Sequence, residues 1–103
     1  MAGAKKKITK KSVKPGKDII ASMADDFRKK LHKLVKDGIR ELTIDLAGVK
    51  MVDSVGLGVL IAAHNSLDDI GGKLKVKNAS DDICSLMKTM RLDQHFEVKA
   101  AQS

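Results

Sequence analysis

Aromatic side chains are almost absent from this 103-residue chain, which contains two phenylalanines and no tryptophan or tyrosine. Modules that bind single-stranded nucleic acid stack bases on exposed aromatic rings, so the composition argues against that class. The single cysteine, Cys84, cannot form an intrachain disulfide and has no metal-binding pattern around it. The longest apolar run, residues 55–63, is too short to cross a bilayer. We therefore expect a cytoplasmic protein without a metal or another cofactor.

Acidic residues are missing from the first 17 positions, which hold seven lysines. The other 13 basic residues are matched by 13 acidic residues, so the net charge of +7 belongs to the N-terminal segment. Residues 1–7 are predicted to form a disordered basic tail, followed by a single domain over residues 8–100. The simplest role of the tail is solubility. The alternative is a weak electrostatic contact with nucleic acid or an anionic membrane.

Alternating and helical patterns of apolar residues predict four strands and three helices. The expected strands span residues 8–13, 39–46, 73–77 and 95–98, and the expected helices span residues 22–38, 54–70 and 81–90. The first helix should bury one stripe of side chains: Met23, Phe27, Leu31, Leu34 and Val35. Ser22 and Asp25 have the spacing of a capping box, and Ser80 is the expected cap of the last helix. The alternation of elements indicates an α/β domain with a parallel or mixed sheet.

The segment "VDSVGLGVL", residues 52–60, joins the second predicted strand to the second helix. Ligands of α/β proteins usually bind where a strand ends, and a helix N-terminus favours an anion. Ser54 is either the N-cap of this helix or a phosphorylation acceptor. Gly56 and Gly58 belong to no nucleotide-binding motif, because residue 61 is isoleucine and no Lys-Ser or Lys-Thr follows. We expect these glycines to allow a neighbouring backbone or a partner protein to approach closely.

The sequence contains no evident catalytic set. His32, His64 and His95 stand far from one another in the sequence. A Ser-His-acid triad requires the histidine to lie within hydrogen-bond reach of the serine, and nothing in the sequence places His64 beside the Ser54 hydroxyl. Asp45 is expected to accept a hydrogen bond from a nearby backbone N–H or to face solvent. The chain is therefore predicted not to be an enzyme.

Residues 39–98 resemble the STAS domain of anti-sigma-factor antagonists, whose motif D-L-S-x-V-x-x-x-D-S-[ST]-G-L-G-x-L precedes a helix, Gly-Gly, a strand and a last helix. The matching residues are Asp45, Leu46, Val49, Asp53, Ser54, Gly56, Leu57, Gly58, Leu60, Gly71, Gly72, Leu92 and Phe96. The resemblance implies a four- or five-stranded mixed β-sheet with about three to four helices packed mainly on one side. It also implies a bacterial regulator of transcription or signalling that binds an anti-sigma factor or a related histidine-kinase-like ATPase. The implied contact residues are Asp53, Ser54, Val55, Gly56, Leu57 and Gly58.

Two departures from this motif bear on function. The family's phosphorylated hydroxyl precedes the first glycine of the motif, where this chain has Val55, so Ser54 is the remaining candidate for phosphorylation. Only one strand is expected before the first helix, which would leave a sheet edge open to a partner or to a second copy of the chain. Two alternatives stay open at this point. One is a STAS scaffold module that is never phosphorylated, and the other is a nucleic-acid-associated protein that acts through its basic tail.

Overall fold

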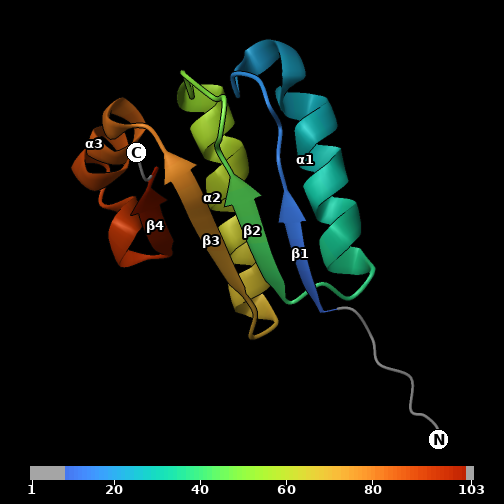
Figure 1. The fold of residues 1–103 in the computed structure, drawn as a ribbon. Coiled ribbons are helices and arrows are strands. Elements are labelled where there is room, and N and C mark those ends of the chain that lie inside the picture. The colour runs from blue at the N-terminus through green and yellow to red at the C-terminus, as the bar shows by residue number, and fades with distance from the viewer. Residues whose placement is uncertain (1–8, 102–103) are drawn as a thin grey trace, which may run out of the picture.

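The computed structural model describes residues 9–101 and shows strands and helices that alternate along the chain (Figure 1). The strands are β1 (Lys10–Val13), β2 (Glu41–Asp45), β3 (Lys73–Ala79) and β4 (Glu97–Ala100), and the helices are α1 (Ala21–Lys36), α2 (Ser54–Asp69) and α3 (Asp81–Thr89). A 3-10 turn at Leu92–Gln94 joins α3 to β4. The predicted order of elements is confirmed. The predicted basic tail, residues 1–7, lies outside the described residues.

The four strands form one sheet in the order β1-β2-β3-β4, and all three pairings are parallel. The α/β fold class is confirmed, but the antiparallel pairing of a mixed sheet does not occur among residues 9–101. The reason is the connectivity, because each of the first three strands is followed by a helix that returns the chain to the same end of the sheet. Within the described residues, no strand lies beyond β1. Pairing of that edge with a partner stays a prediction.

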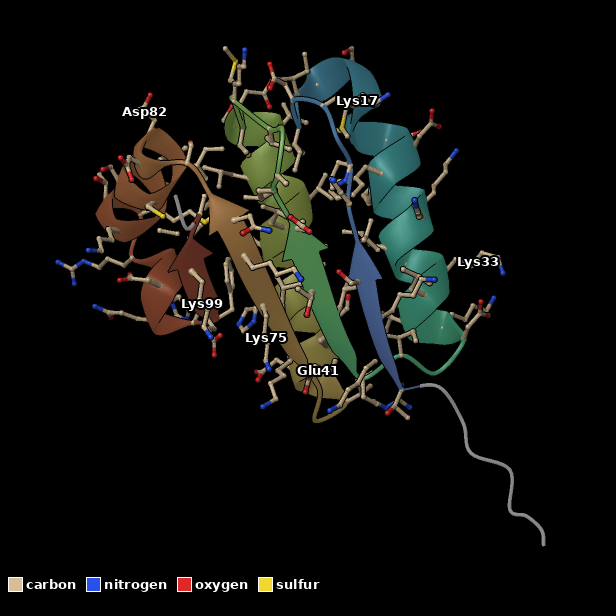
Figure 2. The ribbon with its side chains drawn as sticks, viewed as in Figure 1. Lys17, Lys33, Glu41, Lys75, Asp82 and Lys99 are labelled. Atoms are coloured by element: carbon tan, nitrogen blue, oxygen red, sulfur yellow. The ribbon has the colours of Figure 1, made fainter. Side chains whose placement is uncertain are left out.

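The strands bury alternate side chains, so only one face of the sheet carries the core. In β2, Leu42 and Ile44 are fully buried, whereas Glu41 and Thr43 are partly exposed. In Figure 1, α2 lies behind the sheet, α1 lies beside β1 and packs against α2, and α3 lies beside β4. The opposite face is polar, and Lys75 and Glu41 form an ion pair of 3.3 Å there (Figure 2). The helices therefore leave one face of a parallel sheet open to solvent, although such sheets are usually covered on both faces.

Helix α1 packs through the predicted stripe. Phe27 and Leu31 are buried, and Met23, Leu34 and Val35 are partly buried against the same core. The predicted capping box is wrong, because α1 begins at Ala21, and its N-cap residue, Ile20, makes no side-chain cap. Asp25 instead pairs with cations one turn further along α1. Its carboxylate oxygens lie 2.6 Å from Arg28 and 3.3 Å from Lys29.

Helix α3 begins as predicted, since the Ser80 hydroxyl accepts a hydrogen bond from the backbone N–H of Ile83 at 3.2 Å. Its last residue is Thr89 and its C-cap is Met90, after which Arg91 has a φ of 61°. This left-handed conformation ends many helices and usually belongs to glycine. Within residues 9–101, no helix is both long and apolar enough to traverse a lipid bilayer.

Candidate functional site

The loop between β2 and α2 is fixed to the segment that precedes α1. The Asp18 carboxylate accepts hydrogen bonds from the backbone N–H groups of Lys50 (2.8 Å) and Met51 (3.0 Å). The backbone of Ile19 then bonds to both sides of the same loop, because its N–H donates to the Met51 carbonyl and its carbonyl accepts from the Asp53 N–H. Val49 and Val52 anchor the loop in the core. These contacts hold the junction in one conformation.

Asp53 caps two helices with one carboxylate. Its Oδ1 accepts from the backbone N–H of Gly56 at 2.8 Å, at the start of α2. Its Oδ2 accepts from the backbone N–H of Ala21 at 2.9 Å, at the start of α1. These hydrogen bonds, the Gly56 bond foremost, lower the pKa of Asp53 below its ordinary value of 3.8. The prediction that Ser54 is the N-cap is therefore wrong, because Ser54 is the first residue of the helix.

The two glycines of the junction have different roles. A Cβ atom at Gly56 would collide with the backbone carbonyl of Ile19, so the predicted close approach is confirmed and occurs within this chain. A Cβ atom at Gly58 would meet nothing within 4 Å. Gly56 is thus required by the fold, whereas no contact among the described residues requires a glycine at position 58.

Four residues of the junction face outward, and two apolar side chains are prominent among them. Val55 is 48% exposed and Met51 is 55% exposed, and Ser54 and Gly58 are also exposed. Gly56 and Leu57 are buried, so they position the surface without forming it. Met51 is an apolar residue of the loop after β2. Its exposure could not be read from the pattern, because the loop turns to meet Asp18 at this point.

A groove begins beside Val55 and separates α1 from α2. Its first part has a volume of about 350 Å3 and is bordered by Asp25 and Arg28 of α1 and by Val55, Gly58 and Val59 of α2. Its small residues leave the surface between the helices open. The exposed Val55 side chain therefore stands at one end of a depression and not on a flat surface.

The remaining candidate residues form no reactive set. The predicted backbone contact of Asp45 is confirmed, because its Oδ1 accepts from the Ala47 N–H at 3.0 Å; it also accepts from Asn78 Nδ2 at 2.8 Å. The Asn78 bond, followed by the Ala47 bond, lowers the pKa of Asp45 below 3.8. Ring centroids of His64 and His95 lie 5.9 Å apart, a proximity that the sequence did not reveal. In the part of the chain that the structure describes, no three His, Cys, Asp or Glu side chains are placed to hold a metal ion.

Known proteins are similar to this chain in sequence and in fold. The STAS domain profile matches residues 5–102. The anti-sigma-B factor antagonist of Bacillus subtilis (strain 168) is 32% identical over 74 residues, which are 72% of this chain and 67% of that protein. A crystal structure of a Thermotoga maritima protein assigned as an anti-sigma factor antagonist superimposes with a TM-score of 0.85 at 21% identity, covering 90% of this chain and 82% of the other.

A third relative extends the comparison to a phosphorylated protein. The phosphorylated form of the Bacillus cell fate determinant SpoIIAA superimposes with a TM-score of 0.73 at 12% identity, covering 89% of this chain and 84% of the other. At these identities the two structures show a shared fold only. The family profile spans nearly the whole sequence, and the Bacillus subtilis relative is 32% identical over 72% of this chain. The chain belongs to the STAS domain family.

Proposed function

We propose that this protein is an anti-sigma-factor antagonist, which binds an anti-sigma factor or a related kinase-like ATPase through the β2–α2 junction. The observation that carries the proposal is the junction itself. The carboxylate of Asp53 accepts two backbone hydrogen bonds there, beside the exposed side chains of Val55 and Met51. Exposed apolar side chains on a rigid loop suit protein binding. As a regulator of transcription, the protein would act in the cytoplasm, as a binding protein and not as a catalyst.

The same geometry favours a binding module that is not switched by phosphorylation. Val55 has no hydroxyl, and it stands where the family motif carries the acceptor. Ser54 is exposed, but the Asp53 carboxylate already occupies the start of α2 as an anion and accepts the Gly56 N–H there. A phosphate on Ser54 would bring about −1.5 to −2 charges beside that carboxylate. We therefore propose that partner binding does not depend on phosphorylation at this junction.

The binding surface is tested by titrating the purified protein with the anti-sigma factor encoded in the same genome. Val55→Asp places a charge at the proposed contact and should weaken binding by about tenfold or more, as expected when a charge enters the centre of an interface. Ser85→Asp is the matched control, because Ser85 is exposed on α3 and this change also adds one negative charge. Equal affinities of the two variants would refute a contact at Val55.

Phosphorylation is tested separately by incubating the protein with the partner kinase and ATP and measuring its intact mass. The proposal predicts no added phosphate and unchanged partner affinity. A phosphate that disappears in Ser54→Ala, together with release of the partner, would instead establish a switch that has moved by one residue.

A further inference from the structure

The groove between α1 and α2 continues well beyond Val55. A second depression of about 210 Å3 adjoins the first, and Arg28 and Val59 border both. Together they follow α2 from Val55 to Ser66 and α1 from Ala21 to Val35. At about 1.5 Å per residue, the α2 side extends for roughly 16 Å, or three helical turns. The groove is therefore long enough for a short helix and longer than one inserted side chain requires.

The two walls of this groove differ in charge. Helix α2 has no Asp, Glu, Lys or Arg between Ser54 and Leu67, and its one histidine there, His64, does not border the groove. On the α1 side, Arg28 and His32 border the groove and also the outer face of that helix, where Lys29, Lys33 and Lys36 stand. Two acids, Asp25 and Asp37, pair with cations of this face. Its four Lys and Arg residues exceed these acids by two, so the outer face of α1, next to the groove, carries an excess of positive charge, whereas the α2 wall carries no Asp, Glu, Lys or Arg.

Gly58 lies on the α2 wall of the groove, where the fold alone does not explain a glycine. A glycine inside a helix destabilises that helix relative to alanine, and here a Cβ atom would meet nothing within 4 Å. The residue is exposed, in the second turn of α2. Its lack of a side chain lowers the α2 wall beside Val55, where a helix of another protein could approach the α2 backbone.

We propose that this groove receives an acidic amphipathic helix of the partner protein, an inference that rests on the proposed function. The apolar side of that helix lies on the α2 wall, and its acidic residues reach across Arg28 to the outer face of α1, where Lys29, Lys33 and Lys36 stand. Charge complementarity of this kind sets the orientation of a bound helix and speeds association at low salt. The contact at Val55 would then be one end of a longer interface.

The charged outer face of α1 is tested with the anti-sigma factor encoded in the same genome, by calorimetric titration at low and high salt. The double variant Lys33→Glu/Lys36→Glu should weaken binding by about tenfold at low salt and reduce its salt dependence. Lys73→Glu/Lys77→Glu is the matched control, because both lysines are exposed on β3, away from the groove, and the charge change is the same. Equal losses in the two double variants would overturn the proposal.

The α2 wall is tested with Gly58→Leu, which should weaken binding by about tenfold without lowering the Tm of the free protein, because its Cβ has open space. If this variant does not fold, the charge variants still decide. Wild-type affinity of both groove variants, beside a loss in Val55→Asp, would overturn the groove but not the proposed function. Absence of binding by the unaltered protein would overturn both.

The acidic helix itself is tested with a photo-crosslinking residue at position 62, on the α2 wall of the groove. The crosslinked peptide of the anti-sigma factor should come from an amphipathic helix with several acidic residues on one side. A peptide from a basic or non-helical segment would overturn the inference.

Discussion

The carboxylate of Asp53 accepts a hydrogen bond from the backbone N–H of Ala21, 32 residues earlier in the chain, at 2.9 Å. The same carboxylate accepts a hydrogen bond from the backbone N–H of Gly56 at 2.8 Å, so one residue caps the N-termini of two helices that are far apart in sequence. An N-cap normally serves the helix that follows it directly. This double use makes Asp53 the first residue to test.

Replacing Asp53 should lower stability in steps. Asp53→Asn keeps one acceptor oxygen and loses the other, whereas Asp53→Ala loses both hydrogen bonds. Given typical effects of lost caps in a domain of this size, we expect Tm to fall by roughly 5 °C for asparagine and roughly 10 °C for alanine. Thermal unfolding followed by circular dichroism measures both values. An alanine variant that melts no lower than the asparagine variant would show that only one of the two bonds matters.

The contribution of Asp53 should depend on pH in a defined direction. Its pKa is lowered in the folded protein, chiefly by the Gly56 hydrogen bond, so the folded state favours the charged carboxylate. The stabilisation is therefore complete above the ordinary value of 3.8 and is lost as the pH falls through the lower folded-state pKa. The difference in Tm between the wild type and Asp53→Asn should be largest near pH 6 and should shrink toward pH 2.5. Comparing the two proteins cancels the parallel titration of Asp45. A constant difference across this range would contradict the assignment.

Alanine at the two junction glycines should have opposite effects. Gly56→Ala forces a Cβ against the Ile19 carbonyl, a backbone atom that cannot move aside freely, and should destabilise the protein by about 1–3 kcal/mol. Gly58→Ala meets open space and should stabilise it by roughly 0.5–1 kcal/mol. Urea unfolding of the two variants under identical conditions gives both values. If Gly56→Ala raised the free energy of unfolding as Gly58→Ala does, the start of α2 would have to relax around position 56.

Replacing Arg91 with glycine should stabilise the protein. Its φ of 61° places a side chain in the left-handed region, which costs about 1–2 kcal/mol for a residue other than glycine. Arg91→Gly should therefore raise the free energy of unfolding by roughly 0.5–1 kcal/mol, and Arg91→Val should lower it. The control is Gly71→Ala, at a φ of 77°, which should destabilise. Equal stability of the glycine and valine variants would mean that the end of α3 rearranges.

Patterns of apolar residues predicted the elements of this fold well. The spacing of Phe27 and Leu31 identified the buried side of α1, and the alternation of Leu42 and Ile44 identified the buried side of β2. Such periods depend only on local geometry, which the sequence carries directly. The direction of strand pairing was less certain, because nearly the same pattern serves parallel and mixed sheets.

The details of the site depended on contacts between distant segments, so the sequence located the junction without assigning its roles. Ser54 is a good N-cap by residue type, but Asp53 has two oxygens and lies where Ala21 of a separate helix needs an acceptor. Met51 is apolar, yet it is exposed because Asp18 holds its loop at the surface. Neither fact is encoded in the neighbouring residues alone.

One carboxylate, that of Asp53, accepts hydrogen bonds from the first turns of both α1 and α2. Neither helix can therefore slide along its axis relative to the other without breaking one of these two hydrogen bonds. A protein that binds at Val55 would therefore meet a surface that is already in its final shape. Little conformational freedom remains to be lost there on association, so the interaction would form without prior rearrangement of this chain. Loosening the Asp53 bonds should then reduce the rate of productive encounters even where every contacting side chain is retained.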